Sequence, residues 1–329
     1  MTETLHENHQ RAGEAREALS AVRTEVAKAV VGQDAAVSGL LVALLSGGHV
    51  LMEGVPGVAK TLLVRTLATA LAVDTKRVQF TPDLMPGDIT GSMVIEGGGT
   101  DLTFREGPLF TNLLLADEIN RTPPKTQSAL LEAMEERQVT IGDVTEKLPD
   151  PFLVMATQNP IEQEGTYPLP EAQVDRFLLK VKVDYPKKEE ERQVLDLMLG
   201  GAVPAVSKVL PAEAIHRLTQ RMREVYLDER IRDYVVALVL ATRRPREIGL
   251  PELAHFIGFG ASPRATLAFS EAGRAMAFLR GRGYVVPEDI KEIAKDVLRH
   301  RLILTFEAEA ENVTAETVID RILEKVEVP

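Results

Sequence analysis

The sequence contains no cysteine and no tryptophan among its 329 residues. Without cysteine, disulfide bonds, thiolate metal sites and cysteine nucleophiles are excluded. Long hydrophobic runs are also missing, because stretches such as 40–45 and 235–241 fall far short of the roughly 18 apolar residues that span a bilayer. The polar first ten residues show no signal-peptide core. We therefore expect a cytoplasmic protein without a transmembrane segment.

Basic residues are outnumbered, since 38 lysines and arginines stand against 49 aspartates and glutamates and give a net charge of −11. Such a chain has no global positive field that attracts a phosphate backbone, so nucleic acid is disfavoured as a partner unless a local basic channel exists. The six histidines show no metal-ligand spacing such as His-Glu-x-x-His.

The length of the chain corresponds to roughly two globular domains.

Apolar strands alternate with helical segments in the first half of the chain. We expect strands at 49–53, 78–80, 113–117, 152–157 and 177–183, and helices at 11–30, 34–46, 61–72 and 124–137. This alternation predicts a parallel sheet covered by helices. Two hairpin-like insertions, 92–107 and 138–148, interrupt the pattern at turns rich in glycine.

The character of the chain changes after Tyr185-Pro186. A charged amphipathic helix at 188–199 ends at Gly200-Gly201, and helical periodicity with almost no strand signal follows. The expected helices are 211–227, 231–243, 263–279, 287–300 and 314–326. A separate helical domain is the simplest interpretation.

A glycine-rich turn between the strand 49–53 and the helix 61–72 carries the strongest chemical signal. It comprises Gly54, Val55, Pro56, Gly57, Val58, Ala59, Lys60 and Thr61, with Leu62 next. The pattern is that of a P-loop: backbone N–H groups at a helix N-terminus surround a phosphate, the lysine reaches the β- and γ-oxygens, and the Thr61 hydroxyl coordinates Mg²⁺. Ala59 stands where the strict pattern has glycine, so its backbone must accept the same geometry with a methyl group attached.

Two adjacent carboxylates, Asp117 and Glu118, end the apolar strand 113–117 in the manner of a Walker B motif. We expect Asp117 to hold Mg²⁺ through water and Glu118 to activate a water molecule against the γ-phosphate. Asn159 follows another buried strand and resembles a sensor 1 residue, which would fix the attacking water. Alone, each pattern is common in ordinary loops; together with the P-loop they predict hydrolysis of a nucleoside triphosphate.

Arginine side chains would stabilise the negative charge that develops on the transferred phosphoryl group. Arg176 resembles an arginine finger offered to the nucleotide of a neighbouring subunit, and Arg264 resembles a sensor 2 residue. Arg121 is a weaker third candidate, placed to serve a subunit interface. For each of them the plainer alternative is a solvated or ion-paired surface arginine.

Taken together, these motifs resemble those of the MoxR family of AAA+ ATPases, and the resemblance runs through nearly the whole chain. The segments that carry it are 31–33, 54–61, 80–84, 114–127, 156–170, 175–177 and 260–264. The resemblance implies an αβα P-loop core over residues 31–187, preceded by an N-terminal helix (1–30) and followed by an all-α lid domain (188–329). It further implies that ATP binds between core and lid with Val31 and Gly32 near the adenine. Segments 92–107 and 138–148 would be the helix-2 insertion and the presensor-1 hairpin of this clade.

The resemblance also implies a ring, commonly a hexamer, in which Arg176 acts on the neighbouring subunit. MoxR relatives act as chaperones or remodelling factors, often with a partner that bears a von Willebrand factor A domain, and they mature or activate client complexes, including by insertion of a metal or cofactor. Three other classes stay open: a nucleic-acid motor, an ATP-gated scaffold with little turnover, and a P-loop kinase. The nucleic-acid motor is disfavoured because segment 92–107 carries three carboxylates and one arginine.

Overall fold

The structure, a computed structural model, describes residues 2–54, 59–95, 102–158, 165–199 and 204–329. The chain divides into two compact units. The first, which we call the sheet unit, comprises Ser20–Arg176 and Val181–His216. The second, the helical unit, comprises Met1–Leu19, Phe177–Lys180 and Arg217–Pro329. The chain therefore enters the helical unit for a short stretch directly after Arg176 and then leaves it again.

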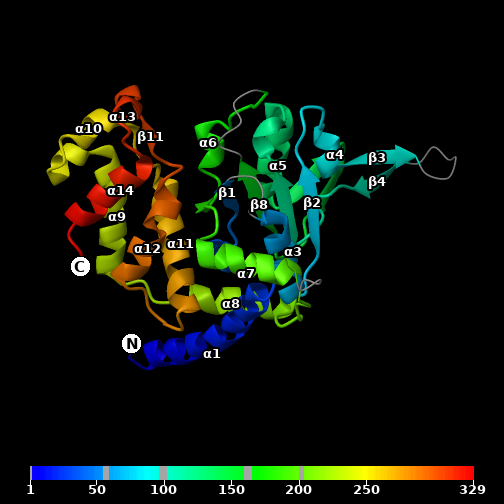
Figure 1. The fold of residues 1–329 in the computed structure, drawn as a ribbon, viewed down its shortest axis with the longest axis horizontal. Helices are drawn as coiled ribbons and strands as arrows, with labels where there is room; N and C mark the ends of the chain where they lie inside the picture. The colour runs from blue at the N-terminus through cyan, green and yellow to red at the C-terminus, as the bar shows by residue number, and fades with distance from the viewer. Residues whose placement is uncertain (1, 55–58, 96–101, 159–164, 200–203) are drawn as a thin grey trace. The chain divides into compact units, whose positions relative to one another are not determined.

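A five-stranded sheet, ordered β2-β5-β8-β1-β9, forms the centre of the sheet unit (Figure 1). Its strands are β1 (Val50–Gly54), β2 (Thr75–Gln79), β5 (Leu113–Asp117), β8 (Leu153–Gln158) and β9 (Leu179–Val183). The β2–β5, β5–β8 and β1–β8 pairs are parallel, which confirms the predicted sheet. β5 and β8 are buried along almost their whole length and therefore appear in the sequence as continuous apolar runs.

Helices lie before, between and after the strands along the chain, and α2 and α3 pack on the sheet. Those of the sheet unit are α2 (Asp34–Ser46), α3 (Lys60–Ala70), α4 (Pro86–Thr90), α5 (Pro124–Glu136), α6 (Glu171–Val174) and α7 (Lys188–Leu199). α2 contacts β1 and β8, and α3 contacts β2 and β5. The predicted bounds of α2 are confirmed, because Gly47 at φ 64° ends the helix where the sequence places its glycine pair. The short helix expected just before Arg176 is α6, whereas α4 was not expected, since five residues show no helical period.

The two predicted insertions are antiparallel hairpins. β3 (Gly91–Ile95) pairs with β4 (Leu102–Glu106), and β6 (Gln138–Ile141) pairs with β7 (Val144–Lys147). Gly142 at φ 60° makes the turn of the second hairpin in the left-handed region that glycine favours. The turn of the first hairpin lies outside the described residues. In Figure 1 the β3–β4 hairpin extends away from the strands of the sheet.

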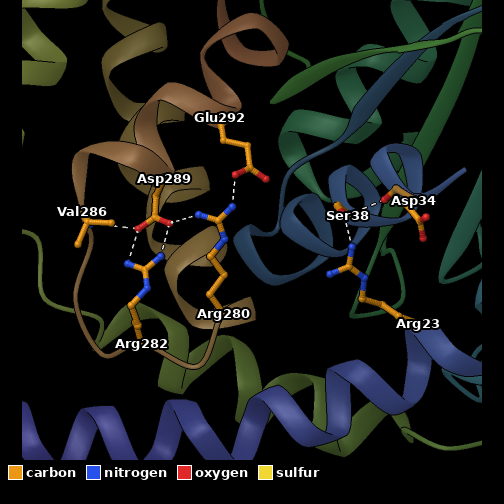
Figure 2. Close-up of polar contacts among 8 residues, drawn as sticks. All are labelled: Arg23, Asp34, Ser38, Arg280, Arg282, Val286, Asp289 and Glu292. Carbon is orange, nitrogen blue, oxygen red and sulfur yellow. Dashed lines mark hydrogen bonds and ion pairs between the residues drawn. The ribbon is translucent and has the colours of Figure 1, made fainter.

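The long helix α1 (Thr2–Ala27) begins well before the predicted 11–30 segment. In the helical unit its early turns are held by polar contacts, which leave no apolar period in the sequence. Asn8 Nδ2 donates to the Glu224 carbonyl oxygen at 2.8 Å, and Arg11 pairs with the Glu224 carboxylate at 3.1 Å. In the sheet unit, Arg23 donates to Ser38 at 2.6 Å, and Ser38 donates to the Asp34 carbonyl at 2.8 Å (Figure 2).

The rest of the helical unit matches the prediction of a helical region. Its helices are the second part of α8 (Ala212–Arg223), then α9 (Glu229–Arg243), α10 (Leu253–Phe256), α11 (Pro263–Leu279), α12 (Pro287–Leu298), α13 (Phe306–Ala310) and α14 (Ala315–Lys325). A two-stranded ribbon of β10 (Ile257–Phe259) and β11 (Ile303–Leu304) is an addition to the predicted helices. Strands of two or three residues are too short to give an alternating pattern.

Asp289 anchors the connection between α11 and α12, with its side chain completely buried. Arg282 donates to Oδ2 at 2.8 Å, Arg280 to Oδ1 at 3.1 Å, and the Val286 N–H to Oδ2 at 3.0 Å (Figure 2). Arg280 also pairs with Glu292. A buried carboxylate is tolerated when its oxygens are paired and hydrogen-bonded in this way.

Within the described parts of the chain, every helix is too short or too polar to span a membrane.

His49, which precedes β1, is a structural residue of the sheet unit. Its ring is buried, Nδ1 accepts from the Val154 N–H at 3.0 Å, and Nε2 therefore carries the proton and donates to the Met134 carbonyl at 3.1 Å. Burial, reinforced by the charge of Arg137, lowers the pKa of His49 to about 3. The neutral ring is consequently the form that the fold requires.

We expect this histidine to make the fold sensitive to acid. Between pH 6.5 and pH 3 the unfolded chain binds a proton at His49 that the folded chain does not bind. The contribution of His49 to the free energy of unfolding is therefore complete above pH 6.5 and is lost as the pH falls below that value. At pH 5 the loss is about 2 kcal/mol, at 1.36 kcal/mol per pH unit. Chemical denaturation at pH 7.5 and pH 5 measures it. His49→Gln should show a smaller loss between these pH values, whereas His255→Gln, at an exposed site, should behave like the wild type; equal losses in all three proteins would contradict the assignment.

Candidate nucleotide-binding site

The carboxyl ends of the parallel strands meet at one edge of the sheet and bring the predicted motif residues together. Gln79 at the end of β2 lies opposite Asp117 at the end of β5, and Gln158 at the end of β8 lies opposite Glu53 in β1. β1 ends at Gly54 and α3 begins at Lys60, so the predicted P-loop connects the strand end to a helix N-terminus. Open parallel sheets bind ligands at this edge.

Lys60 lies at this edge with its side chain half-buried. Its Nζ donates to the carbonyl oxygen of Gly54 at 2.7 Å, across the base of the loop. Burial lowers the pKa of Lys60, and the carboxylates of Asp117 and Glu118 act in the opposite direction. Both carboxylates therefore lie within electrostatic reach of the ammonium group, which places the three charged residues of the two motifs in one site.

Ala59 adopts the left-handed conformation, with φ 56° and ψ 29°, immediately before α3. This conformation explains why the strict pattern has glycine here, because a Cβ in the left-handed region costs roughly 1–2 kcal/mol. Alanine in place of glycine at position 59 therefore strains the backbone at the end of the loop. Strain of this kind is common at ligand-binding sites. Val55, Pro56, Gly57 and Val58 lie outside the described residues, while Thr61 and Leu62 form the first turn of α3.

Both oxygens of the Asp117 carboxylate are oriented by neighbouring strands. Thr157 at the end of β8 donates its hydroxyl proton to Oδ1 at 2.6 Å, and Arg77 on β2 pairs with Oδ2 at 2.7 Å. The same Thr157 hydroxyl accepts the backbone N–H of Glu118 at 2.8 Å. One hydroxyl therefore connects the two adjacent acidic residues to the next strand of the sheet.

Glu118 also has a left-handed backbone, with φ 57° and ψ 51°, which ends β5 and turns the chain into a short 3-10 helix. Its Oε2 accepts from Gln79 Nε2 at 2.7 Å and pairs with Arg121 Nε at 3.1 Å. Arg121, the weakest of the three arginine candidates, is thus a partner of Glu118 in the same chain. These contacts hold the carboxylate at the sheet edge.

Arg77, Gln79 and Thr157 are site residues that no motif in the sequence indicates. Arg77 and Gln79 lie two residues apart on β2, on either side of the buried Val78, and Arg77 donates to the Gln79 side chain at 2.7 Å. The alternation placed their side chains on one face, but only the β2–β5 register shows that this face meets Asp117 and Glu118. Thr157 lies two residues before Asn159, the residue of this segment that the sequence motif indicates. Asn159 lies outside the described residues.

Arg176 lies on a different part of the sheet unit, just after α6. Its Nη1 donates to the Leu131 carbonyl at 3.0 Å and pairs with the Glu135 carboxylate at 2.8 Å, both in α5 of the same chain. The side chain is one-third exposed. Arg176 therefore has its partners on α5 and stands apart from the group formed by Lys60, Asp117 and Glu118.

Arg264 belongs to the helical unit, in the first turn of α11, and is exposed. Its backbone N–H donates to Ser262 Oγ, the helix N-cap, at 3.1 Å. The loop before the helix is fixed to the end of α9: Thr242 Oγ1 accepts the Ala261 N–H at 3.0 Å, and Arg243 donates to the Ala261 carbonyl at 2.6 Å. The position of Arg264 within the helical unit is therefore well defined.

Val31 and Gly32 form the connection between α1 and α2. Gly32 has φ 73°, and a Cβ built there would lie 2.7 Å from Glu190 Oε2 of α7. The same oxygen accepts the Lys187 N–H at 2.7 Å. A glycine at this position allows the connection to approach the start of α7 closely, and any larger residue would displace the Glu190 side chain.

The donor set at the sheet edge fits a magnesium ion. Thr61 contributes a hydroxyl from the first turn of α3 and Asp117 a carboxylate from the end of β5. Hydroxyl and carboxylate oxygens are ligands that Mg²⁺ accepts, and this ion commonly takes one or two protein ligands together with waters and substrate phosphates. Among the described residues no group of three or more histidine or acidic side chains forms a separate metal site.

Comparison with known proteins places this site in a family context. Residues 49–179 match the model of the ATPase family associated with various cellular activities (AAA), and residues 254–322 match that of the AAA lid domain. The chain is 50% identical to Chaperone MoxR1 of Mycobacterium tuberculosis over 93% of this chain and 81% of that protein. It is 33% identical to Protein MoxR of Methylorubrum extorquens over 88% of each chain.

A solved structure supports the same relationship. The crystal structure of a protein from Cytophaga hutchinsonii, proposed to be an ATPase, superposes with a TM-score of 0.92 and 46% sequence identity over 99% of both chains. The similarity therefore extends over both compact units.

Proposed function

Because this chain belongs to the MoxR family of AAA+ ATPases and is an ATPase, we propose that it hydrolyses ATP in a ring, commonly a hexamer, and uses the energy to remodel partner proteins. The observation that carries the proposal is the gathering of Lys60, Asp117 and Glu118 at one sheet edge beside the N-terminus of α3. The N-terminus of a helix that carries a lysine binds phosphate groups. Two carboxylates beside it can hold Mg²⁺ and activate a water molecule, as hydrolysis of a triphosphate requires.

Substrate binding is assigned to the loop and to the first turn of α3. The backbone N–H groups of residues 54–62, except that of Pro56, which has none, are assigned to the phosphates, and Lys60 exchanges its hydrogen bond to the Gly54 carbonyl for the β- and γ-oxygens. Val31 and Gly32 contact the adenine, as in the family. Thr61 and Asp117 hold Mg²⁺, which when bound neutralises phosphate charge and orients the γ-phosphate.

The hydrolytic step is assigned to Glu118 as the base that takes a proton from the attacking water. Its Oε2 partners, Gln79 and Arg121, keep the carboxylate at the sheet edge, where water reaches both it and a phosphate held by Lys60. Asn159 orients the water, Arg176 completes the site of the neighbouring subunit, and Arg264 responds to the γ-phosphate as sensor 2. Each of these roles is proposed from its motif position.

The cellular role is proposed from the relatives. One relative bears the name chaperone, and the chain aligns with it over most of both lengths. We therefore place this protein in the cytoplasm as a motor that matures or activates client complexes, with a von Willebrand factor A domain protein as its partner and metal or cofactor insertion as one outcome. ATP binding would alter contacts within and between subunits, because only differential contacts can drive such a change.

A trapping experiment tests the cellular role. The Glu118→Gln protein is incubated with ATP and captured from a cell lysate, and the molecules that bind to it are identified. Recovery of client proteins, in amounts that fall when ADP replaces ATP, supports the remodelling function. Recovery of nucleic acid in an ATP-dependent manner would instead favour a nucleic-acid motor.

Lys60→Ala should weaken ATP binding about 10- to 100-fold, because hydrogen bonds to charged groups contribute about 1.5–3 kcal/mol each. A fluorescent ATP analogue titrated into each variant measures the affinity. Lys76→Ala is the matched control, since Lys76 is exposed on β2 and alternates to the face opposite Arg77 and Gln79. Unchanged affinity in Lys60→Ala would remove the loop as the phosphate site.

A further inference from the structure

The division between the two compact units falls on the peptide bond that follows Arg176. Arg176 is the last residue of its stretch in the sheet unit, and Phe177–Lys180 belongs with the helical unit. The Arg176 side chain is held by α5 through Leu131 and Glu135. The Arg176 side chain and the carbonyl of the next residue are thus held by different groups of contacts.

Three consecutive residues that follow α12 hold the segment Phe177–Lys180. Arg301 donates to the Phe177 carbonyl at 2.8 Å and to the Leu178 carbonyl at 3.2 Å, and His300 Nε2 donates to the Phe177 carbonyl at 3.0 Å. Arg299 donates to the Lys180 carbonyl at 2.7 Å. Every one of these bonds ends on backbone, so they determine the path of the chain whatever side chains it carries.

This connection is buried, and two of its three donors, Arg299 and Arg301, are charged. Phe177 is completely buried, and Arg301 is 7% exposed. Burial, with the neighbouring charges of Arg301, Lys180 and Arg299, keeps the pKa of His300 well below its usual value, so the ring is neutral and uses its Nε2 proton for the Phe177 carbonyl. Buried bonds from cationic donors are stronger than neutral surface ones. The three residues after α12 therefore fix the backbone that directly follows Arg176, in the stretch where Leu179 and Lys180 begin β9.

We propose that Arg301 and His300 are positioning residues for Arg176: by holding the Phe177 carbonyl they fix the backbone from which the arginine finger extends. The inference rests on the proposed role of Arg176 at the neighbouring subunit's ATP. To act there, Arg176 must exchange its contacts with Leu131 and Glu135 for phosphate oxygens. Arg301 and His300 act on that exchange because they hold the carbonyl of the next residue.

A complementation assay separates this role from a general structural one. Arg301→Ala has an intact Lys60 but a displaced finger, whereas Lys60→Ala has a defective phosphate site but an intact finger. Arg301→Ala alone should lose about 100-fold in turnover, the cost of a misplacement of about 1 Å, with the KM for ATP changed less than about twofold. In an equimolar mixture with Lys60→Ala, turnover should rise severalfold above that of either protein alone.

Further variants keep the test decisive if Arg301→Ala does not fold. His300→Gln retains an N–H donor for the Phe177 carbonyl and should keep most of the turnover, whereas His300→Leu, of similar size, should lose it and regain it on mixing with Lys60→Ala. Arg230→Ala is the control on α9, because Arg230 is largely exposed and pairs only locally with Asp228 in the described structure. It should behave like the wild type in every mixture.

The outcomes distinguish the two proposals. If Arg176→Ala regains turnover with Lys60→Ala but Arg301→Ala and His300→Leu do not, the positioning role is overturned while the finger stands. If Arg176→Ala itself regains nothing, the action on the neighbouring subunit fails, and the positioning role fails with it. Equal turnover of His300→Gln and His300→Leu would also overturn the proposal, because only one of them retains the donor.

Discussion

Replacing Glu118 by glutamine should lower ATP turnover about 10²- to 10⁴-fold, the usual contribution of a general base. The amide has nearly the same size as the carboxylate, and its carbonyl oxygen can still accept from Gln79 and Arg121. It cannot take a proton from water at neutral pH. ATP affinity should therefore stay within a few-fold of the wild type, because Lys60 and Thr61 are unaffected. Steady-state phosphate release and titration of a fluorescent ATP analogue measure the two quantities.

Glu136→Gln provides the matched control, since Glu136 is an exposed carboxylate on α5 of the same unit. It should retain wild-type turnover. A Glu118→Gln protein with unchanged turnover would remove Glu118 as the base and would support the alternative of a carboxylate that only orients Arg121 and Gln79. A protein that loses ATP affinity in parallel with turnover would show that the charge of Glu118 is needed for the structure of the site.

The parts of the fold that the sequence predicted are those with a strong local signal. The helix 34–46 and the strand 113–117 were located with the bounds that the structure shows, because a run of apolar residues ends at a glycine pair in one and at two carboxylates in the other. The start of α1 was missed because polar contacts to Glu224 hold it. The β10–β11 ribbon was missed because it is too short to show a period.

The candidate site divides in the same manner. Residues that are adjacent in the chain, such as Asp117 with Glu118 or Lys60 with Thr61, follow from motif spacing. The contacts of Arg77, Gln79 and Thr157 depend on how three strands align, and alignment between strands distant in sequence is fixed only by the tertiary structure. The same holds for the three donors after α12, since nothing in their local sequence indicates which carbonyls they bond.

Arg176→Ala should lower turnover about 10³- to 10⁵-fold, the range found when an arginine finger is absent. ATP affinity should remain, because the contacts of Arg176 in its own chain are made to α5 and not to the phosphate site. An equimolar mixture with Lys60→Ala should regain turnover, since each protein carries the part that the other lacks. Arg176→Lys should recover little, because an ammonium group lacks the fork of donors that holds a phosphoryl group.

Glu135→Gln decides whether the loss comes from the finger or from the contact with α5. If Arg176 only fastened the chain to α5, removal of its ion-pair partner would impair turnover in the same manner as removal of the arginine. The pair is partly exposed on both sides, and such pairs contribute about 0–1 kcal/mol to stability. We therefore expect Glu135→Gln to fold normally and to retain turnover, or to increase it slightly, because the arginine is released more easily toward the neighbouring nucleotide. Equal losses of turnover in Arg176→Ala and Glu135→Gln would contradict the role of Arg176 as an arginine finger and would show that the residue only stabilises the contact with α5.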